Sequence, residues 1–127
     1  MSEFVEYLHE VFEHFGPIRS RKMFGGHGIY HNDLMFGLVA DDELYLKTDK
    51  QNVALFEDRN LGPFEFVAKG KTSKMSYYAA PEEVYDDFEQ ATYWAEVAFN
   101  AALRADEKKR QQAARKKAKS KPSNSKK

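Results

Sequence analysis

Three glycines, Gly25, Gly26 and Gly28, constrain the fold of this chain more than any other feature. Met23 and Phe24 precede them, and apolar residues resume directly afterwards. Glycine is favoured within a strand where the backbone must bulge, bend or approach another chain, because it has no Cβ. These five residues therefore predict a structural motif, a bulge within one strand.

A phosphate-binding loop is the alternative interpretation of the same glycines. Such a loop needs a strand before the glycines and a helix that opens after them. Here Ile29 and Tyr30 continue as strand, and the segment lacks both the third glycine of a dinucleotide fingerprint and the lysine of a P-loop. The pattern favours the structural role and predicts no cofactor.

Hydrophobic periodicity predicts alternating helices and hairpins. Apolar residues recur every three to four positions from Ser2 to Phe15, which is typical of an amphipathic helix. Strands are expected from Ile18 to Tyr30, Leu34 to Ala40 and Glu43 to Lys47, separated by short polar turns. Thr48 and Gln51 have the spacing of a capping box for a second, short helix.

The second half repeats this arrangement. A hairpin is expected from strands at Phe64 to Val67 and Lys74 to Ala79. Pro81 is placed as the first residue of a long third helix. Its predicted apolar face consists of Val84, Phe88, Ala91, Ala95, Ala98 and Ala102. The order α-β-β-β-α-β-β-α predicts an α+β fold, with helices packed on a mostly antiparallel sheet of about five strands.

Composition is typical of one hydrophobic core. The 127 residues are 42% apolar and contain no cysteine, which excludes disulfides and thiolate chemistry and fits a reducing compartment. No apolar run has the length of a signal peptide or membrane span, so we expect a cytoplasmic protein with no membrane partner.

The sign of the net charge differs between the two parts of the chain. Residues 1–103 carry 9 Lys and Arg against 18 Asp and Glu, whereas residues 104–127 carry 11 against 2. We therefore expect a folded domain over 1–103, followed by a basic helical extension and a disordered tail over 104–127. The basic tail either binds nucleic acid without sequence preference or only solubilises the chain. Its candidate contacts are Lys108, Lys109, Arg110, Arg115, Lys116 and Lys117.

Catalytic and metal-binding patterns do not emerge. His9 and His14 are five residues apart and diverge on a helix, whereas the metalloprotease motif needs a spacing of four. His27 and His31 would need a third ligand from elsewhere. The acidic residues near Pro81 complement a helix dipole better than they form a catalytic carboxylate pair. No catalytic or metal residue is assigned.

Large aromatic residues on the strands suggest a second, outward face of the sheet, since successive side chains alternate between faces. Ordinary packing, a protein interface and a base-stacking platform are the three interpretations. The predicted partner surface consists of Arg21, Lys22, Tyr30, Tyr45 and Tyr78.

Five segments carry a resemblance to the N-terminal domain of the TfoX/Sxy family. They are Arg21 to Tyr30, Phe36 to Val39, Leu44 to Asp49, Met75 to Tyr78, and Pro81 through Ala95. The Met-Phe-Gly-Gly-x-Gly core is the most specific of them, and the likeness covers residues 3 to 103. Longer members of the family add a C-terminal helical domain, where this chain has its Lys/Arg-rich tail.

The resemblance implies a compact α+β domain in regulators of natural DNA competence, which assist the cyclic-AMP receptor protein at bacterial promoters. It implies a non-enzymatic transcription coregulator that binds the transcription machinery. Nucleic-acid binding through the tail, self-association as a homodimer, and an enzyme of unknown chemistry are the alternatives.

Overall fold

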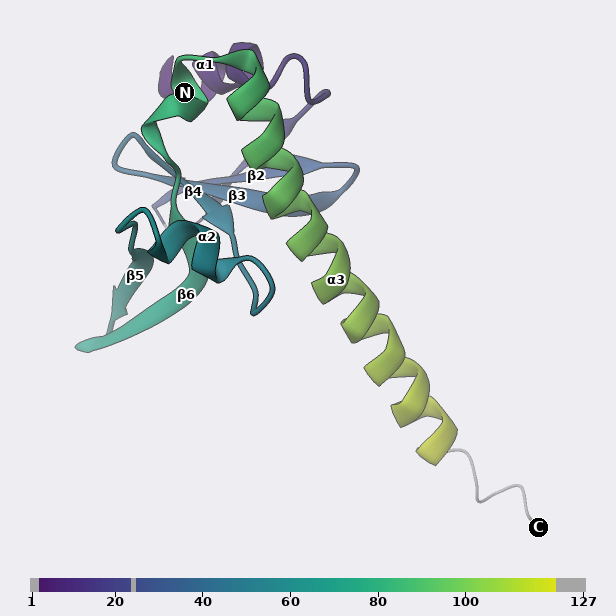
Figure 1. The fold of residues 1–127 in the computed structure, drawn as a ribbon. Helices are drawn as coiled ribbons and strands as arrows, with labels where there is room; N and C mark the ends of the chain where they lie inside the picture. The colour runs from purple at the N-terminus through teal and green to yellow at the C-terminus, as the bar shows by residue number, and fades with distance from the viewer. Residues whose placement is uncertain (1–2, 24, 121–127) are drawn as a thin grey trace.

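The structure, a computed structural model, describes residues 3–23 and 25–120. Its helices and strands follow the chain in the order shown in Figure 1. They are α1 (Glu3–Val11), β1 (Arg19–Met23), β2 (Gly26–His31), β3 (Leu34–Ala40), β4 (Glu43–Lys47), α2 (Val53–Glu57), β5 (Pro63–Ala68), β6 (Lys71–Ala79), the 3-10 helix η1 (Glu82–Tyr85) and α3 (Phe88–Ser120).

Within the described residues, one sheet has the strand order β1-β2-β3-β4-β6-β5, and every neighbouring pair is antiparallel. The α+β class predicted from the sequence is confirmed. The strand count was wrong, because the segment expected as one strand from Ile18 to Tyr30 is a hairpin of β1 and β2. Gly25 stands between them with φ +75°, a left-handed conformation that suits glycine and reverses the chain.

The three α-helices contribute to one core against a single face of the sheet. Phe12 following α1, Phe36 of β3, Phe56 of α2 and Trp94 of α3 belong to this cluster. Small residues on α3 let the helix lie close to β3 and β4. Ala91, Ala95, Ala98 and Ala102 are buried as predicted, but Phe88 is 47% exposed. Phe88 instead stacks its ring on His14, with centroids 4.4 Å apart.

Helix starts differ from the sequence-based predictions. Asp49, not Thr48, organises the approach to α2, because its Oδ1 accepts hydrogen bonds from the backbone N–H groups of Gln51 and Asn52. Pro81 precedes η1 rather than α3. At the start of α3, Asp87 Oδ1 accepts the backbone N–H of Glu89 at 2.8 Å. Short polar side chains capture free N–H groups before a helix, and these local bonds decide where the helices begin.

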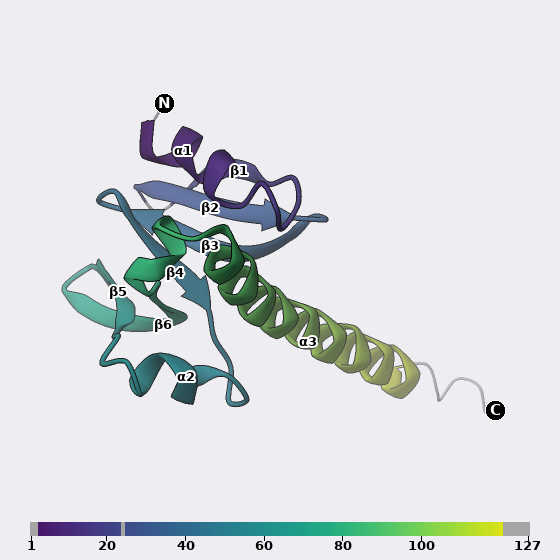
Figure 2. The same cartoon turned by 45° about the horizontal axis from the view of Figure 1, so that its top comes forward.

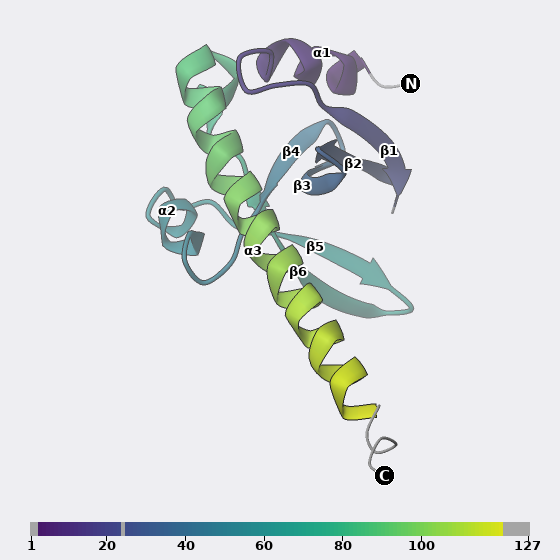
Figure 3. The same cartoon turned by 90° about the vertical axis from the view of Figure 1, so that its right-hand side faces the viewer.

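The first helix is shorter than the periodicity predicts. It ends at Val11, and tighter turns carry the chain from Phe12 to Gly16. Ser2, the first residue of the predicted helix, lies outside the described residues. Figures 2 and 3 show α1 beside the β1–β2 end of the sheet, while α3 crosses the sheet and continues well past it.

Residue 103 is not a break in the secondary structure. The helix α3 continues through it, and side chains become exposed from Glu107 onwards. The helical extension that was expected is thus the second half of α3, and the tail over 121–127 lies outside the described residues. No helix in the described part of the chain combines the length and the apolar character needed to cross a membrane.

Candidate functional site

The glycine motif lies in the β1–β2 hairpin, where Gly25 stands in the turn and Gly26 and Gly28 lie on β2. A Cβ at Gly26 would stand 2.0 Å from the backbone oxygen of Val39, so this glycine permits close approach of β2 to β3. At Gly28 a Cβ would meet the side chains of Met23 and Met35 at 2.9 and 3.0 Å. Gly25 has open space around it. Phe24 lies outside the described residues. These glycines therefore determine the path of the backbone. The strand β2, and not a helix, follows Gly25, as the structural interpretation of the motif requires.

The sheet irregularity lies further along than the glycines suggest. The register between β2 and β3 shifts between Ile29 and Tyr30, so Ile29 pairs with Gly37 and Tyr30 with Met35. Phe36 is the extra residue of this bulge and is fully buried in the core. The bulge of this region was therefore expected at the wrong residues, because a partner strand decides where a register shifts.

One row of residues crosses four strands on the face opposite the helices, which we call the outer face. Arg21 pairs with Gly28, Gly28 with Leu38, and Leu38 with Tyr45. Cross-strand partners share a face, so Arg21 and Tyr45 lie on the same side of the sheet. Tyr30 joins them, two residues from Gly28 on the same strand.

The remaining residues of the predicted partner surface lie apart from this row. Lys22 follows Arg21 on the edge strand and points to the opposite side by alternation. Tyr78 pairs with Leu46 and packs on the core side, with its ring centroid 6.0 Å from that of Phe56. Its hydroxyl donates to Glu57 Oε2 at 3.3 Å. The structure thus brings together Arg21, Tyr30 and Tyr45, and separates Lys22 and Tyr78 from them.

The side chains at the centre of the outer face are buried, whereas those at its rim, which includes Tyr30 and Tyr45, are partly exposed. Leu38 and Tyr77 are 1% and 8% exposed, whereas Tyr30 and Tyr45 are half-buried. Burial raises the pKa of Tyr77 to about 12. Burial is also the largest cause of the raised pKa of Tyr45, followed by the nearby carboxylate of Glu43.

Arg19 belongs to the same rim, although it was not singled out in the sequence. It pairs with Tyr30 across the β1–β2 hairpin, and its guanidinium donates to Asp33 at 2.8 Å while both side chains remain largely exposed. With Arg21 and Tyr30 it surrounds a shallow hollow at the sheet edge. Two-residue alternation from Arg21 is the sequence signal that could have placed Arg19 on this face.

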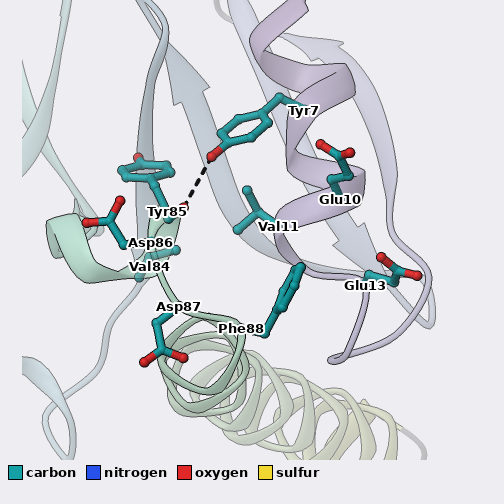
Figure 4. A pocket seen from close by; sticks show the side chains of 9 residues that line it. All are labelled: Tyr7, Glu10, Val11, Glu13, Val84, Tyr85, Asp86, Asp87 and Phe88. Atoms are coloured by element: carbon teal, nitrogen blue, oxygen red, sulfur yellow. Dashed lines mark hydrogen bonds between the residues drawn. The ribbon is translucent and has the colours of Figure 1, made fainter.

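A second cleft lies between α1 and the junction of η1 with α3 (Figure 4). It has a volume of about 270 Å³, and the hydroxyl of Tyr7 donates across it to the carbonyl of Tyr85 at 3.2 Å. Burial raises the pKa of Tyr85 to about 12. Acidic side chains stand around it, namely Glu10, Glu13, Asp86 and Asp87.

Two of the four histidines, His14 and His31, have structural partners. The ring of His14 stacks on Phe88, and Nδ1 of His31 lies 2.8 Å from the carbonyl oxygen of Pro17. In residues 3–23 and 25–120, no three metal-ligating side chains gather at one point.

The basic residues of the extension lie on the second half of α3. Lys108, Lys109, Arg110, Arg115 and Lys116 are exposed, while the side chain of Lys117 lies outside the described ones. Arg110 is partly neutralised by an ion pair with Asp106 at 3.0 Å. These side chains occupy several sides of one helix, in keeping with a diffuse positive surface.

Comparisons with known proteins match most of this chain to a family. The family model described as the TfoX N-terminal domain matches residues 10–102. The DNA transformation protein TfoX1 of Aliivibrio fischeri is 32% identical over 82 residues, which cover 65% of this chain. The chain spans only 39% of the length of that relative. The matched residues run from α1 into α3 and include the whole sheet, so this chain belongs to the TfoX N-terminal domain family.

Proposed function

We propose that this protein is a non-enzymatic regulatory or adaptor domain with a role in DNA competence, acting through contact with a protein of the transcription machinery. The relative named for DNA transformation supports the process. The observation that supports the mode of action is the outer-face rim, where Arg19 and Arg21 of the exposed edge strand β1 lie beside Tyr30 of β2.

The edge strand favours an extended, acidic partner segment. Four of the five residues of β1 are exposed, and a strand at the edge of a sheet presents unpaired backbone groups to another chain. Three of these residues are basic, namely Arg19, Arg21 and Lys22. Like charges oppose pairing of β1 with a second copy of itself, and they attract carboxylates.

The test is a chromosomal replacement in the source organism. R21E combined with Y30S changes the rim without touching the buried core. K50E is the control, because it reverses an exposed charge in the turn before α2. The proposal expects loss of transformation, and of a cross-link to the partner, in the rim variant only. Normal transformation by the R21E/Y30S variant, at normal protein abundance, would contradict it.

Sequence-independent nucleic-acid binding through the basic half of α3 is the second candidate. It is favoured by one observation: exposed Lys and Arg side chains lie on a helix that projects away from the acidic body. Binding of this kind weakens steeply with salt because counterions are released. Duplex binding measured against salt for the full chain and for a chain ending at residue 106 tests it, and equal affinities would reject it.

A further inference from the structure

A hollow opens where α3 leaves the sheet. It has a volume of about 230 Å³ and lies between the end of β4, the start of β3 and the middle of α3. Lys47, Tyr77 and Lys109 provide its polar lining, together with Asp106. The apolar lining comes from Leu34, Met35, Ala102 and Ala105.

Two lysine residues line this hollow. Lys47 is half-buried, and its Nζ lies 5.2 Å from the centroid of the Tyr77 ring. Lys109 reaches the same hollow from α3. Burial lowers the pKa of Lys47, and the charge of Lys109 lowers it further, against the opposite effect of Asp49. Two positive side chains thus lie close together where one is partly withdrawn from water.

The neighbouring carboxylates are already engaged by arginines. Arg104 donates to both oxygens of Asp49, at 2.6 and 3.0 Å. Arg110 pairs with Asp106 at 3.0 Å. Among residues 3–23 and 25–120, no carboxylate lies within ion-pair distance of Lys47 or Lys109. The hollow therefore retains positive charge that its own carboxylates do not neutralise.

We propose that this hollow binds a phosphate dianion, either free or carried by a small organic molecule. Lysine is a common phosphate ligand that acts as a point charge, and two lysines match the two charges of the anion. Tyr77, which also lines the hollow, carries a hydroxyl that can donate a hydrogen bond, and the apolar side chains suit an organic group next to the phosphate. Met35, which lines the hollow, pairs with Tyr30 across β2 and β3, so the site adjoins the rim proposed for protein contact.

The experiment is a titration of the isotopically labelled full chain, in which the amide and lysine side-chain NMR signals are monitored at each ligand concentration. The probes are inorganic phosphate, adenosine monophosphate and adenosine. Saturable shifts are expected for both phosphate-bearing probes around Lys47, Tyr77 and Lys109, and none for adenosine. Tighter binding of the monophosphate than of phosphate indicates an organic carrier, while equal affinity indicates free phosphate.

Matched substitutions distinguish a specific phosphate site from nonspecific electrostatic attraction of the anion to α3. K47M and K109M are each expected to weaken binding about tenfold, because a charge-assisted contact is lost. K108M removes the same charge from the neighbouring position of α3 and should leave affinity unchanged. Thermal melting of each variant checks that the fold persists, and K109M alters only an exposed side chain. Absence of saturable shifts, or equal weakening by K108M and K109M, would overturn the proposal.

Discussion

Arg104 of α3 forms an ion pair with Asp49, which lies 55 residues earlier in the chain, in the turn before α2. The guanidinium donates from Nε to Oδ2 at 2.6 Å and from Nη2 to Oδ1 at 3.0 Å, a bidentate pair that is only partly exposed. The same carboxylate accepts the backbone N–H groups before α2. One side chain thus fixes both the start of α2 and the position of α3.

This pair predicts an acid-dependent contribution to stability. Hydrogen bonding to Arg104 lowers the pKa of Asp49, so the contribution is present above the ordinary carboxyl pKa and is lost as pH falls through the lowered value. R104M should reduce the free energy of unfolding by about 1 kcal/mol near neutral pH and by less in acid. Urea unfolding at both pH values measures this. R110M breaks a more exposed pair and is the control, and an equal loss at every pH for R104M would contradict the linkage.

The glycines predict a ranking of alanine substitutions. G26A should be the most destabilising, by about 3 kcal/mol or more, because the new Cβ meets backbone that cannot move aside. G25A should cost about 1 kcal/mol, since only the left-handed backbone is strained. G28A should fall between them because the flexible Met23 and Met35 can shift. Thermal melting gives the order, and a G25A variant less stable than G26A would refute the close approach.

Burial of Tyr77 and Tyr85 predicts that their hydroxyl groups ionise at a higher pH than that of an exposed tyrosine. Burial raises the pKa of both Tyr77 and Tyr85 to about 12, so the folded state favours their neutral forms. Stability from this source is intact below the ordinary tyrosine pKa and is lost as pH rises towards the raised value. Ultraviolet titration should show a late component that Y77F and Y85F each reduce. A wild-type protein whose tyrosines all ionise together while folded would contradict it.

Close packing of the first half of α3 predicts that the same substitution destabilises the protein strongly at a buried position of the helix and little at an exposed one. A95L should destabilise by about 1–3 kcal/mol, because Ala95 is fully buried against the sheet. A113L places the same side chain on the exposed half and should change stability by less than about 0.5 kcal/mol. Urea unfolding compares the two, and similar losses would mean that the helix does not pack as described.

Local patterns predicted the class of the fold and much of its core. The spacing of Ala91, Ala95 and Ala98 indicated the buried face of α3 correctly, since helical periodicity acts within one element. The hairpin at Gly25 was missed because strand-forming residues flank the turn on both sides, and strand propensity alone cannot locate a reversal.

The candidate sites were harder to predict because they depend on long-range contacts. Arg21, Tyr30 and Tyr45 share a face through the register of β1 to β4, which local patterns do not specify. The convergence of Lys47 with Lys109 joins residues from β4 and α3 that no sequence motif connects. The separation of Tyr78 from Tyr45 follows likewise from how β6 pairs with β4.

The unbroken course of α3 has a mechanical consequence. A helix of 33 residues is about 50 Å long, at 1.5 Å per residue. Its first half is anchored on β3 and β4, so its second half is a stiff arm of set reach. Any molecule held near its tip is kept at a distance from the sheet edge that the residue count of the arm determines, and deleting one turn would shorten that distance by about 5 Å while leaving the anchored half in place.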